Sequence, residues 1–340
     1  MQRRTLLQAA SGLLPSTLAG LPLGTAAQPA TTAPPAGLPA ATGYPDRVIR
    51  YIVPVAAGGG SDLVGRTVTE RWGKALGQGF VVENQGGGGG VIACQNTVRA
   101  PADGYTLMQG YVATHGTSPA TRKLPYDPVR DFTPIGMIGA TPNVLVIDAN
   151  LPVKDFKEFV AYLDANKGRV SYGSAGPGSL THLTMELMKL QLKTPMVHIP
   201  YRGIAPALTD AMGGQTQAVF PGLAAALQHI RSGRLRALAV TGTSRAAQLK
   251  DVPTLDELGL KNFDAVQWYG VVGPAGIPPA VVQRLNDTLN GVLNAPDLRD
   301  KLAGEAVEPL PLSAADFGAY LQRDLARWTA LAKAQNIQLD

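Results

Sequence analysis

The sequence predicts an α/β protein of two domains with largely parallel sheets, and three observations support this fold class. From Tyr44 onward, short runs of β-branched and aliphatic residues alternate with stretches of helical periodicity, which is the pattern of βαβ units. The chain has 340 residues, more than a single hydrophobic core usually supports. Hydrophobic residues make up 45% and charged residues 16% of it, a composition typical of globular proteins.

Eight runs are expected to form strands: 48–53, 80–83, 106–110, 143–147, 170–172, 196–199, 218–220 and 235–241. Between them lie helices such as Leu180 to Leu192, which has a leucine at every third or fourth position of one face. A last helix is expected from about Ala314. Its apolar stripe is Phe317, Leu321, Leu325, Trp328 and Leu331. We interpret both stripes as core packing.

The N-terminus has the pattern of an export signal. Arg3 and Arg4 are followed by an uncharged, mostly apolar segment and then by small residues, and the arginine pair resembles the twin-arginine class. Pro15 and Pro22 interrupt the apolar run, which disfavours a membrane anchor. We therefore expect a signal peptide over 1–27, a disordered linker rich in Pro, Ala and Thr over 28–43, and a periplasmic protein exported by the twin-arginine route.

Two segments are expected to cross between the domains. They are Ile138–Val144, which leaves the first α/β unit, and Gln267–Pro274, whose Gly, Pro and aromatic residues suit a returning segment. Domain 1 would then comprise 44–142 and 268–340, and domain 2 would comprise 143–267. Two crossings make a hinge, and the cleft beside it is the natural ligand site.

The turn PVAAGGGSD, from Pro54 to Asp62, follows the first strand and precedes a helix. Its glycines let the backbone approach a ligand, and a helix N-terminus attracts anions. A carboxylate fits better than a phosphate, because the turn has no Walker lysine, the chain has no complete G-x-G-x-x-G, and Asp62 would repel a polyphosphate. Asp62 itself either pairs with Arg66 one helical turn later or contacts the ligand.

Two further loops of this kind follow strands. In Gly173–Leu183, the hydroxyls of Ser174, Ser179 and Thr181 add donors to the backbone amides, and Ser179 is also a good helix cap. The third loop is Gly110–Gly116. Three donor-rich loops from two domains could meet across one cleft, and helix capping alone accounts less well for such convergence.

Several classes of function are disfavoured by what the sequence contains. The net charge of +5, two units of which come from the leader, is spread without a cluster of basic and aromatic residues, so nucleic acid is not expected as a partner. Cys94 is the only cysteine, which excludes an internal disulfide and a multi-thiolate metal site. No metal and no cofactor are expected.

No motif points to catalysis. The serine-hydrolase pattern G-x-S-x-G is absent, and neither Ser61 nor Ser174 has a base at a diagnostic spacing. The histidines, which show no metal-ligand spacing and are interpreted as structural or surface residues, are His115, His182, His198 and His229. The protein is therefore not expected to be an enzyme.

A series of segments carries a resemblance to a known family. They are VIRYIVPVAAGGGSDLVGR, VVENQGGGGG, APADGYTLMQG, LPYDPVRDFTPIGMI, YGSAGPGSLTHL, VHIPYRGIAPALTDAMGGQ, LRALAVTGTSR and DVPTLDELGL. Together they resemble the Bug family, the extracytoplasmic solute receptors of tripartite tricarboxylate transporters, over essentially all of 44–340. The resemblance implies a two-lobed Venus-flytrap periplasmic binding protein that acts with integral-membrane transporter subunits. We expect a monomer that does not itself insert into a membrane.

The resemblance also implies how a ligand is held. Family members hold the carboxylate of a small organic acid with backbone amides, hydroxyls and bridging waters from the loops that correspond here to Ala56–Asp62 and Ser174–Thr181. The expected ligand-site residues are Ala57, Gly58, Gly59, Ser61, Asp62, Tyr111, Val112, Thr114, Ser174, Ala175, Gly178, Ser179, Thr181, Tyr201 and Pro221. Phe220-Pro221-Gly222 stands where many members have Asp-Asn, which disfavours an amino-acid ligand.

Two other functions stay open on the sequence alone. One is a secreted α/β enzyme that acts on an organic acid, and the other is a receptor that presents its ligand to a sensor protein. Only the absence of catalytic motifs argues against the enzyme, and no sequence feature argues for or against the sensor.

Overall fold

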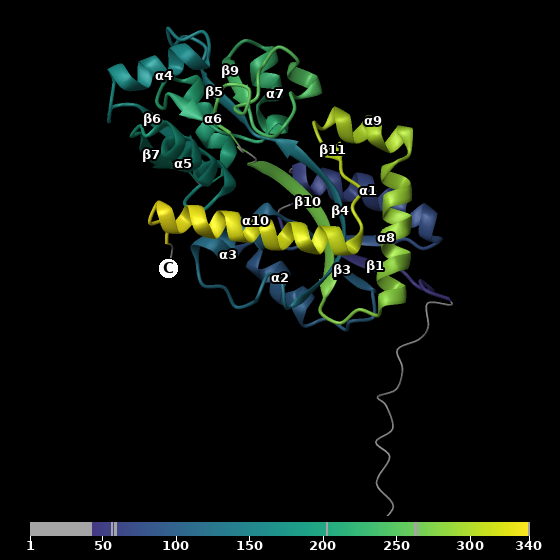
Figure 1. Cartoon of the computed structure of the whole chain (residues 1–340). Helices are drawn as coiled ribbons and strands as arrows, with labels where there is room; N and C mark the ends of the chain where they lie inside the picture. The colour runs from purple at the N-terminus through teal and green to yellow at the C-terminus, as the bar shows by residue number, and fades with distance from the viewer. Residues whose placement is uncertain are drawn as a thin grey trace, which may run out of the picture. The chain divides into compact units, whose positions relative to one another are not determined.

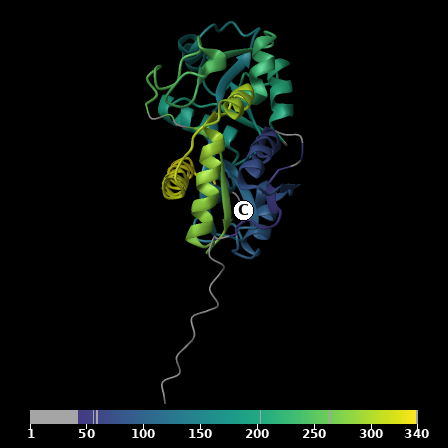
Figure 2. The ribbon, with the colours of Figure 1, turned by 90° about the vertical axis from the view of Figure 1, so that its right-hand side faces the viewer.

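The computed structural model describes residues 43–55, 57, 60–201, 203–261, 263 and 265–338. The predicted signal peptide and, apart from Gly43, the predicted linker lie outside the described residues, as do Gly58 and Gly59. The described chain forms two mixed β-sheets with helices packed against them (Figure 1). Figures 1 and 2 show the teal-to-green elements β5–β9 and α4–α7 gathered in one group, and the purple-to-blue elements around β1–β3 in another.

The first sheet has, among the described residues, the strand order β11-β4-β10-β3-β1-β2. Its strands are β1 (Ile49–Val53), β2 (Phe80–Asn84), β3 (Thr106–Tyr111), β4 (Phe132–Pro142), β10 (Val266–Pro274) and β11 (Glu308–Pro309). β1 pairs in parallel with β2 and β3. β10 runs antiparallel to β3 and β4, and β11 antiparallel to β4.

The second sheet has the order β7-β6-β8-β5-β9 in the part of the chain that is described. Its strands are β5 (Val144–Asp148), β6 (Ser171–Ser174), β7 (Val197–Pro200), β8 (Ala218–Val219) and β9 (Leu235–Val240). β6 pairs in parallel with β7 and β8, whereas β5 runs antiparallel to β8 and β9.

The α/β fold class is confirmed, but the expectation of mainly parallel sheets is wrong: among the described residues, three of the five strand pairings in the first sheet and two of the four in the second are antiparallel. In the first sheet the antiparallel pairings all involve β4 or β10. The sequence showed these segments only as crossings, because their glycines and prolines dilute the strand pattern. Strand direction depends on how the connections run in space, which the local patterns of hydrophobic residues do not report.

Helices flank both sheets and bury one face each. They are α1 (Gly60–Leu76), α2 (Val91–Val98), α3 (Ser118–Thr121), α4 (Phe156–Ala165), α5 (Leu180–Leu192), α6 (Ile204–Met212), α7 (Leu223–Arg231), α8 (Pro279–Leu293), α9 (Pro296–Gly304) and α10 (Ala314–Ala334). Short turns of other helix types occur at η1 (Gly88–Gly90), η2 (Ala113–Thr117) and η3 (Ala247–Leu249). α5 and α10 occupy the ranges predicted for them.

The predicted stripe of α10 is largely confirmed as core. Phe317, Leu321, Trp328 and Leu331 are buried and Leu325 is half-buried. α10 packs against β4, α3, α8, η2 and α5, so it contacts elements attached to both sheets. Ser313 begins the helix, because its side chain accepts a hydrogen bond from the Asp316 amide at 3.1 Å.

The leucine stripe predicted for α5 is only partly core. Leu180 and Leu183 are buried, but Leu187 is half-buried and Leu190 is 42% exposed. The helix instead buries polar residues: Thr181, His182, Thr184 and Glu186. Buried polar groups need partners, so this face of α5 belongs to a polar network.

Two links join the sheets, and they are tied to each other. β4 runs into β5 with only Asn143 between them, and β9 reaches β10 through 241–265. The Asn143 amide donates to Thr241 Oγ1 at 2.8 Å, and Thr241 Oγ1 donates to the Ala265 carbonyl at 2.8 Å. The return to the first sheet therefore falls before Gln267–Pro274, which lies inside β10.

Candidate functional site

The parallel strands β1, β2 and β3 end at one edge of the first sheet, and the loops that follow them converge there. A Cβ at Gly90, after β2, would lie 2.5 Å from Thr114 Cγ2, after β3, and 3.3 Å from Pro54 Cβ, after β1. Gly90 has φ of 94°, a conformation that favours glycine. The structure thus brings together the predicted first and third loops, and adds the Gly87–Gly90 loop, whose glycine run signals such an approach.

Asp62 pairs within the protein. It is 5% exposed, and its Oδ1 accepts from Arg66 Nε at 3.0 Å and from Asn84 Nδ2 at 2.8 Å. The predicted pairing with Arg66 is confirmed. Because Asn84 ends β2, this carboxylate also fixes the first turn of α1 to the neighbouring strand.

Gln109, which sequence reasoning missed, binds one of the predicted site residues. It is fully buried on β3, and its Nε2 donates to Ser61 Oγ at 2.8 Å and to the Ser61 carbonyl at 2.9 Å. Ser61 itself is half-buried, and Ala57 lies exposed in the preceding turn. Gln109 therefore fixes the N-terminus of α1 beside the predicted anion-binding turn.

The loop after β3 is stabilised by hydrogen bonds between its own residues. Thr114 Oγ1 donates to the Tyr111 carbonyl at 3.1 Å, and the Tyr111 amide donates back to Thr114 Oγ1 at 3.3 Å. Thr114 and Val112 are fully buried, while Tyr111 is half-buried. In this structure Thr114 and Val112 support the loop, and their contact with a ligand stays a prediction.

The second sheet has a matching edge where the parallel strands β6, β7 and β8 end. Ser174 ends β6, Tyr201 follows β7, and Pro221 lies just beyond β8. The Tyr201 amide donates to the Ser174 carbonyl at 3.0 Å, and the Pro221 carbonyl accepts from the Val144 amide at 2.9 Å. α5, which starts at this edge, packs against η2 of the first edge, so the two sets of loops adjoin.

Within the loop 174–181, side chains already bind the backbone amides. The Ala175 amide donates to Thr181 Oγ1 at 2.8 Å, the Gly176 amide to Ser174 Oγ at 3.1 Å, and the Gly178 amide to His182 Nδ1 at 3.1 Å. Ser179 caps α5 through the His182 amide at 3.3 Å. The loop is a preorganised turn whose amides have partners that a ligand would have to replace.

A polar cluster lies behind this loop. The rings of His182 and His198 stack with centroids 4.0 Å apart, and Tyr172 stacks on His198 at 4.9 Å. The buried carboxylate of Glu186 accepts from the Tyr172 hydroxyl and, at 2.6 Å, from Lys189 Nζ. Burial, followed by the neighbouring Glu186, raises the pKa of Tyr172.

Ser174 has a histidine beside it that no spacing along the sequence indicated. Its Oγ lies 2.6 Å from His198 Nε2. The contact comes from the pairing of β6 with β7, which no spacing along the chain reveals. Ser174 is fully buried and its Oγ also accepts from the Gly176 amide, so the contact positions the loop and leaves no exposed nucleophile.

His115, from η2, is a core residue as expected. It is 1% exposed, and burial lowers its pKa to about 3. Its ring packs on Phe132 with centroids 4.7 Å apart. His229 lies on α7, with Nδ1 2.6 Å from Arg234.

Across the described chain, no three His, Cys, Asp or Glu side chains are grouped so as to hold a metal ion. No described helix is long and apolar enough to span a bilayer.

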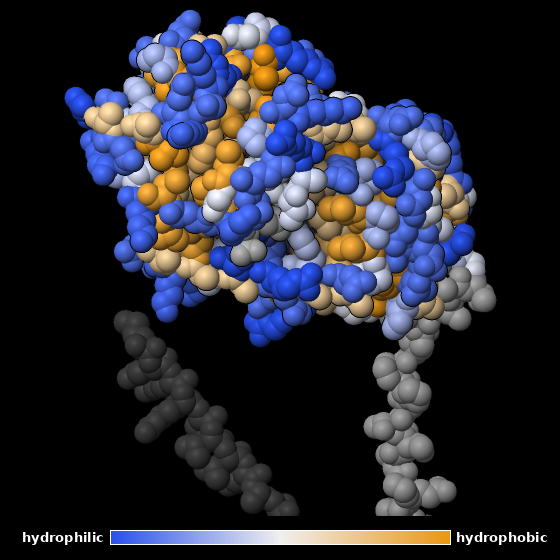
Figure 3. All heavy atoms as spheres, turned by 45° about the horizontal axis from the view of Figure 1, so that its top comes forward, coloured by the Kyte–Doolittle hydropathy of each residue, from blue (hydrophilic) through white to orange (hydrophobic). Residues whose placement is uncertain are grey.

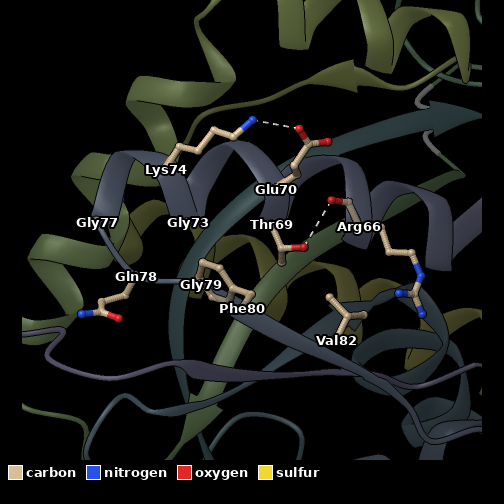
Figure 4. A pocket seen from close by; sticks show the side chains of 10 residues that line it. All are labelled: Arg66, Thr69, Glu70, Gly73, Lys74, Gly77, Gln78, Gly79, Phe80 and Val82. Carbon is tan, nitrogen blue, oxygen red and sulfur yellow. Dashed lines mark hydrogen bonds and ion pairs between the residues drawn. The ribbon is translucent and has the colours of Figure 1, made fainter.

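Two surface hollows lie away from the predicted site residues. One, of about 640 Å³, lies against α1 and the start of β2, where Lys74 Nζ is paired with Glu70 at 3.0 Å (Figure 4). The other, of about 620 Å³, lies between the 242–248 segment and α9 with β11. On the face drawn in Figure 3, hydrophilic and hydrophobic residues are interspersed.

Comparison with known proteins gives consistent matches. The family described as "Tripartite tricarboxylate transporter family receptor" matches residues 64–337. BugT of Bordetella pertussis is 32% identical over 302 residues, 87% of this chain and 91% of BugT. Rpa4515 of R. palustris, solved with adipate, has a TM-score of 0.77 and 32% identity over 85% of this chain and 97% of its own. MatC of Rhodopseudomonas palustris, solved with bound malate, has a TM-score of 0.74 and 30% identity over 85% and 99%.

Proposed function

Because the chain belongs to the family of tripartite tricarboxylate transporter receptors, which includes the Bug proteins, we propose that it is a periplasmic binding protein that captures a small carboxylate between two lobes. Two integral-membrane subunits of such a transporter would accept the ligand from it. One observation carries the proposal. The loops that follow the parallel strands β1–β3 adjoin those that follow the parallel strands β6–β8, because η2 of the first set packs against α5 of the second. Carboxyl ends of parallel strands are where α/β proteins bind ligands.

The ligand we propose is a di- or tricarboxylate. Two relatives have structures with the dicarboxylates adipate and malate. In this chain the carboxylate would be held by backbone amides at the N-termini of α1 and α5, whose positive ends favour an anion. The residues proposed to contact it, or to support those that do, are the ones expected from the sequence: Ala57, Gly58, Gly59, Ser61, Asp62, Tyr111, Val112, Thr114, Ser174, Ala175, Gly178, Ser179, Thr181, Tyr201 and Pro221.

The family consists of substrate-binding receptors, and we propose that this chain has no catalytic activity. The contact between Ser174 and His198 is the one observation that would suggest a hydrolase. A nucleophile must reach its substrate, whereas Ser174 is fully buried.

We also propose that the protein is exported by the twin-arginine route through Arg3 and Arg4. Replacing both arginines with lysine would then block export.

A thermal-shift screen of the purified protein tests the proposed function. The panel consists of short mono-, di- and tricarboxylates, including malate and adipate, with the corresponding diamides as uncharged controls. A ligand at about 100 times its dissociation constant adds about 2.7 kcal/mol of apparent stability, and we expect this for at least one acid and for no diamide. Chemical turnover of a stabilising acid would replace the receptor with an enzyme, and no stabilisation by any acid would contradict carboxylate binding.

The sequence predicted a first lobe of 44–142 with 268–340 and a second lobe of 143–267. Because β10 begins at Val266, we propose that the first lobe comprises 44–142 and 266–340, and the second lobe 143–265. The hinge would be Asn143 and Thr241–Ala265, where Thr241 bonds both links. A stabilising acid is then expected to reduce the radius of gyration in small-angle X-ray scattering, because ligands close such hinges. The corresponding diamide should leave it unchanged, and an unchanged radius with a saturating acid would argue against closure.

A further inference from the structure

The Gly178 amide has one acceptor in this structure, and that acceptor can titrate. The amide donates to His182 Nδ1 at 3.1 Å. Gly178 has φ of 72°, a left-handed conformation that directs this amide and that glycine adopts without strain. His182 lies in the first turn of α5 and is 7% exposed.

The contact fixes the protonation state of His182. A neutral imidazole that accepts at Nδ1 carries its proton on Nε2, and Nε2 lies 3.8 Å from Glu186 Oε1. Glu186 also accepts from Lys189 at 2.6 Å. His182 is thus held neutral at the loop, with a carboxylate behind it that would stabilise a second proton.

A ligand carboxylate and His182 compete for the same hydrogen. Backbone N–H groups have one proton to donate, so a carboxylate that takes the Gly178 amide displaces His182 Nδ1. A buried nitrogen left without a hydrogen-bond partner is destabilising. Protonation of Nδ1 removes this cost, because the imidazolium nitrogen becomes a donor that faces the new anion.

We propose that His182 is a positioning residue that holds the Gly178 amide in the ligand-free protein and takes up a proton when a carboxylate binds, so that carboxylate affinity increases as the pH falls. The inference rests on the proposed function and deepens it. It gives the buried polar residues of α5, such as His182 and Glu186, a role in ligand binding in addition to their role in packing.

The electrostatic surroundings of His182 give the direction of the effect. Burial, followed by His198 of β7, lowers the pKa of His182 to about 4, and Glu186 opposes this while Lys189 adds to it. Of the elements packed on α5, β6 carries Tyr172 and η2 carries His115, whose burial keeps it neutral. The third, α10, carries Asp324 and Arg327, which form an ion pair with each other. Above about pH 4 the free protein is therefore neutral at His182, and ligand binding raises the pKa, so binding takes up a proton and weakens as the pH rises.

Calorimetric titration with malate and with adipate, between about pH 6 and 8 where both acids are ionised, tests this. For wild type we expect affinity to fall by up to about tenfold per pH unit. Titration in two buffers of different ionisation enthalpy should show uptake of up to about one proton per ligand. This second measurement needs no variant.

His182→Asn is the informative variant. Its side-chain oxygen can accept from the Gly178 amide in place of Nδ1 but does not titrate, so binding should persist with a nearly flat pH profile. His229→Asn, on α7 outside the site, should keep the wild-type profile. A melting curve of each variant checks the fold.

The outcomes separate the two proposals. Binding by wild type with no pH dependence and no proton uptake would overturn the role of His182 and leave the proposed function intact. An unchanged pH profile in a folded His182→Asn protein would overturn it as well. No binding of any acid in the screening panel at any of these pH values would overturn both.

Discussion

Replacing Gly270 by alanine is expected to lower the free energy of unfolding by about 3 kcal/mol. Gly270 lies in β10 between β3 and β4, and a Cβ there would overlap the ring of Phe317 on α10, with Cε2 only 2.7 Å away. Phe317 is fully buried and cannot swing aside without displacing Trp268, whose ring it meets at 5.9 Å. Thermal unfolding should show a midpoint lowered by about 5 °C.

Gly291→Ala is the matched control. Gly291 lies exposed in α8, and a Cβ at this position would have no other atom within 4 Å. Alanine is the better helix former, so the same change should raise stability by about 0.5–1 kcal/mol. Equal melting midpoints for the two variants would mean that α10 does not pack on β10 as described.

Replacing Gly178 by valine is expected to weaken carboxylate binding by about tenfold to 100-fold. The φ of 72° at this position disfavours any β-branched residue, so the amide of residue 178 would turn away from the site. One charge-assisted hydrogen bond contributes about 1.5–3 kcal/mol, which corresponds to that loss of affinity. Calorimetric titration with the acid that gives the largest thermal shift measures it.

Gly168→Val separates the loss of binding from backbone strain. Gly168 has φ of 74° and nothing within 4 Å of its Cβ position, and it lies between α4 and β6, outside the proposed site. Valine should strain both turns to a similar degree, but only the Gly178 variant should lose affinity. Wild-type affinity in Gly178→Val would remove the loop 174–181 from the binding site.

Local patterns predicted much of the fold because they reflect local physics. The helix Leu180–Leu192 follows from its hydrophobic period and from the Ser179 cap, and both are visible in sequence. β4 was missed as a strand because Pro134, Gly136 and Gly139 weaken its pattern. Glycine is needed at Gly136, where a Cβ would lie 2.8 Å from Asn286 Nδ2, a constraint that exists only once α8 is packed on the sheet.

The candidate site, like the fold, could be predicted from the sequence only in part. The glycine-rich turns and the helix caps follow from residues within each loop, so the sequence predicts that such loops exist. The side chains that fix them come from other strands: Gln109 reaches Ser61 from β3, and His198 reaches Ser174 from β7. These pairings depend on sheet order and register, which one sequence does not report.

The most direct test of carboxylate capture by these loops is a crystal structure of the protein with the acid that stabilises it most. We predict a carboxylate group within hydrogen-bond distance of the backbone at 57–62 and at 174–181, with the Gly178 amide turned from His182 to the ligand. An acid bound instead in the hollow between the 242–248 segment and α9, with the Gly178 amide still on His182 Nδ1, would contradict the account.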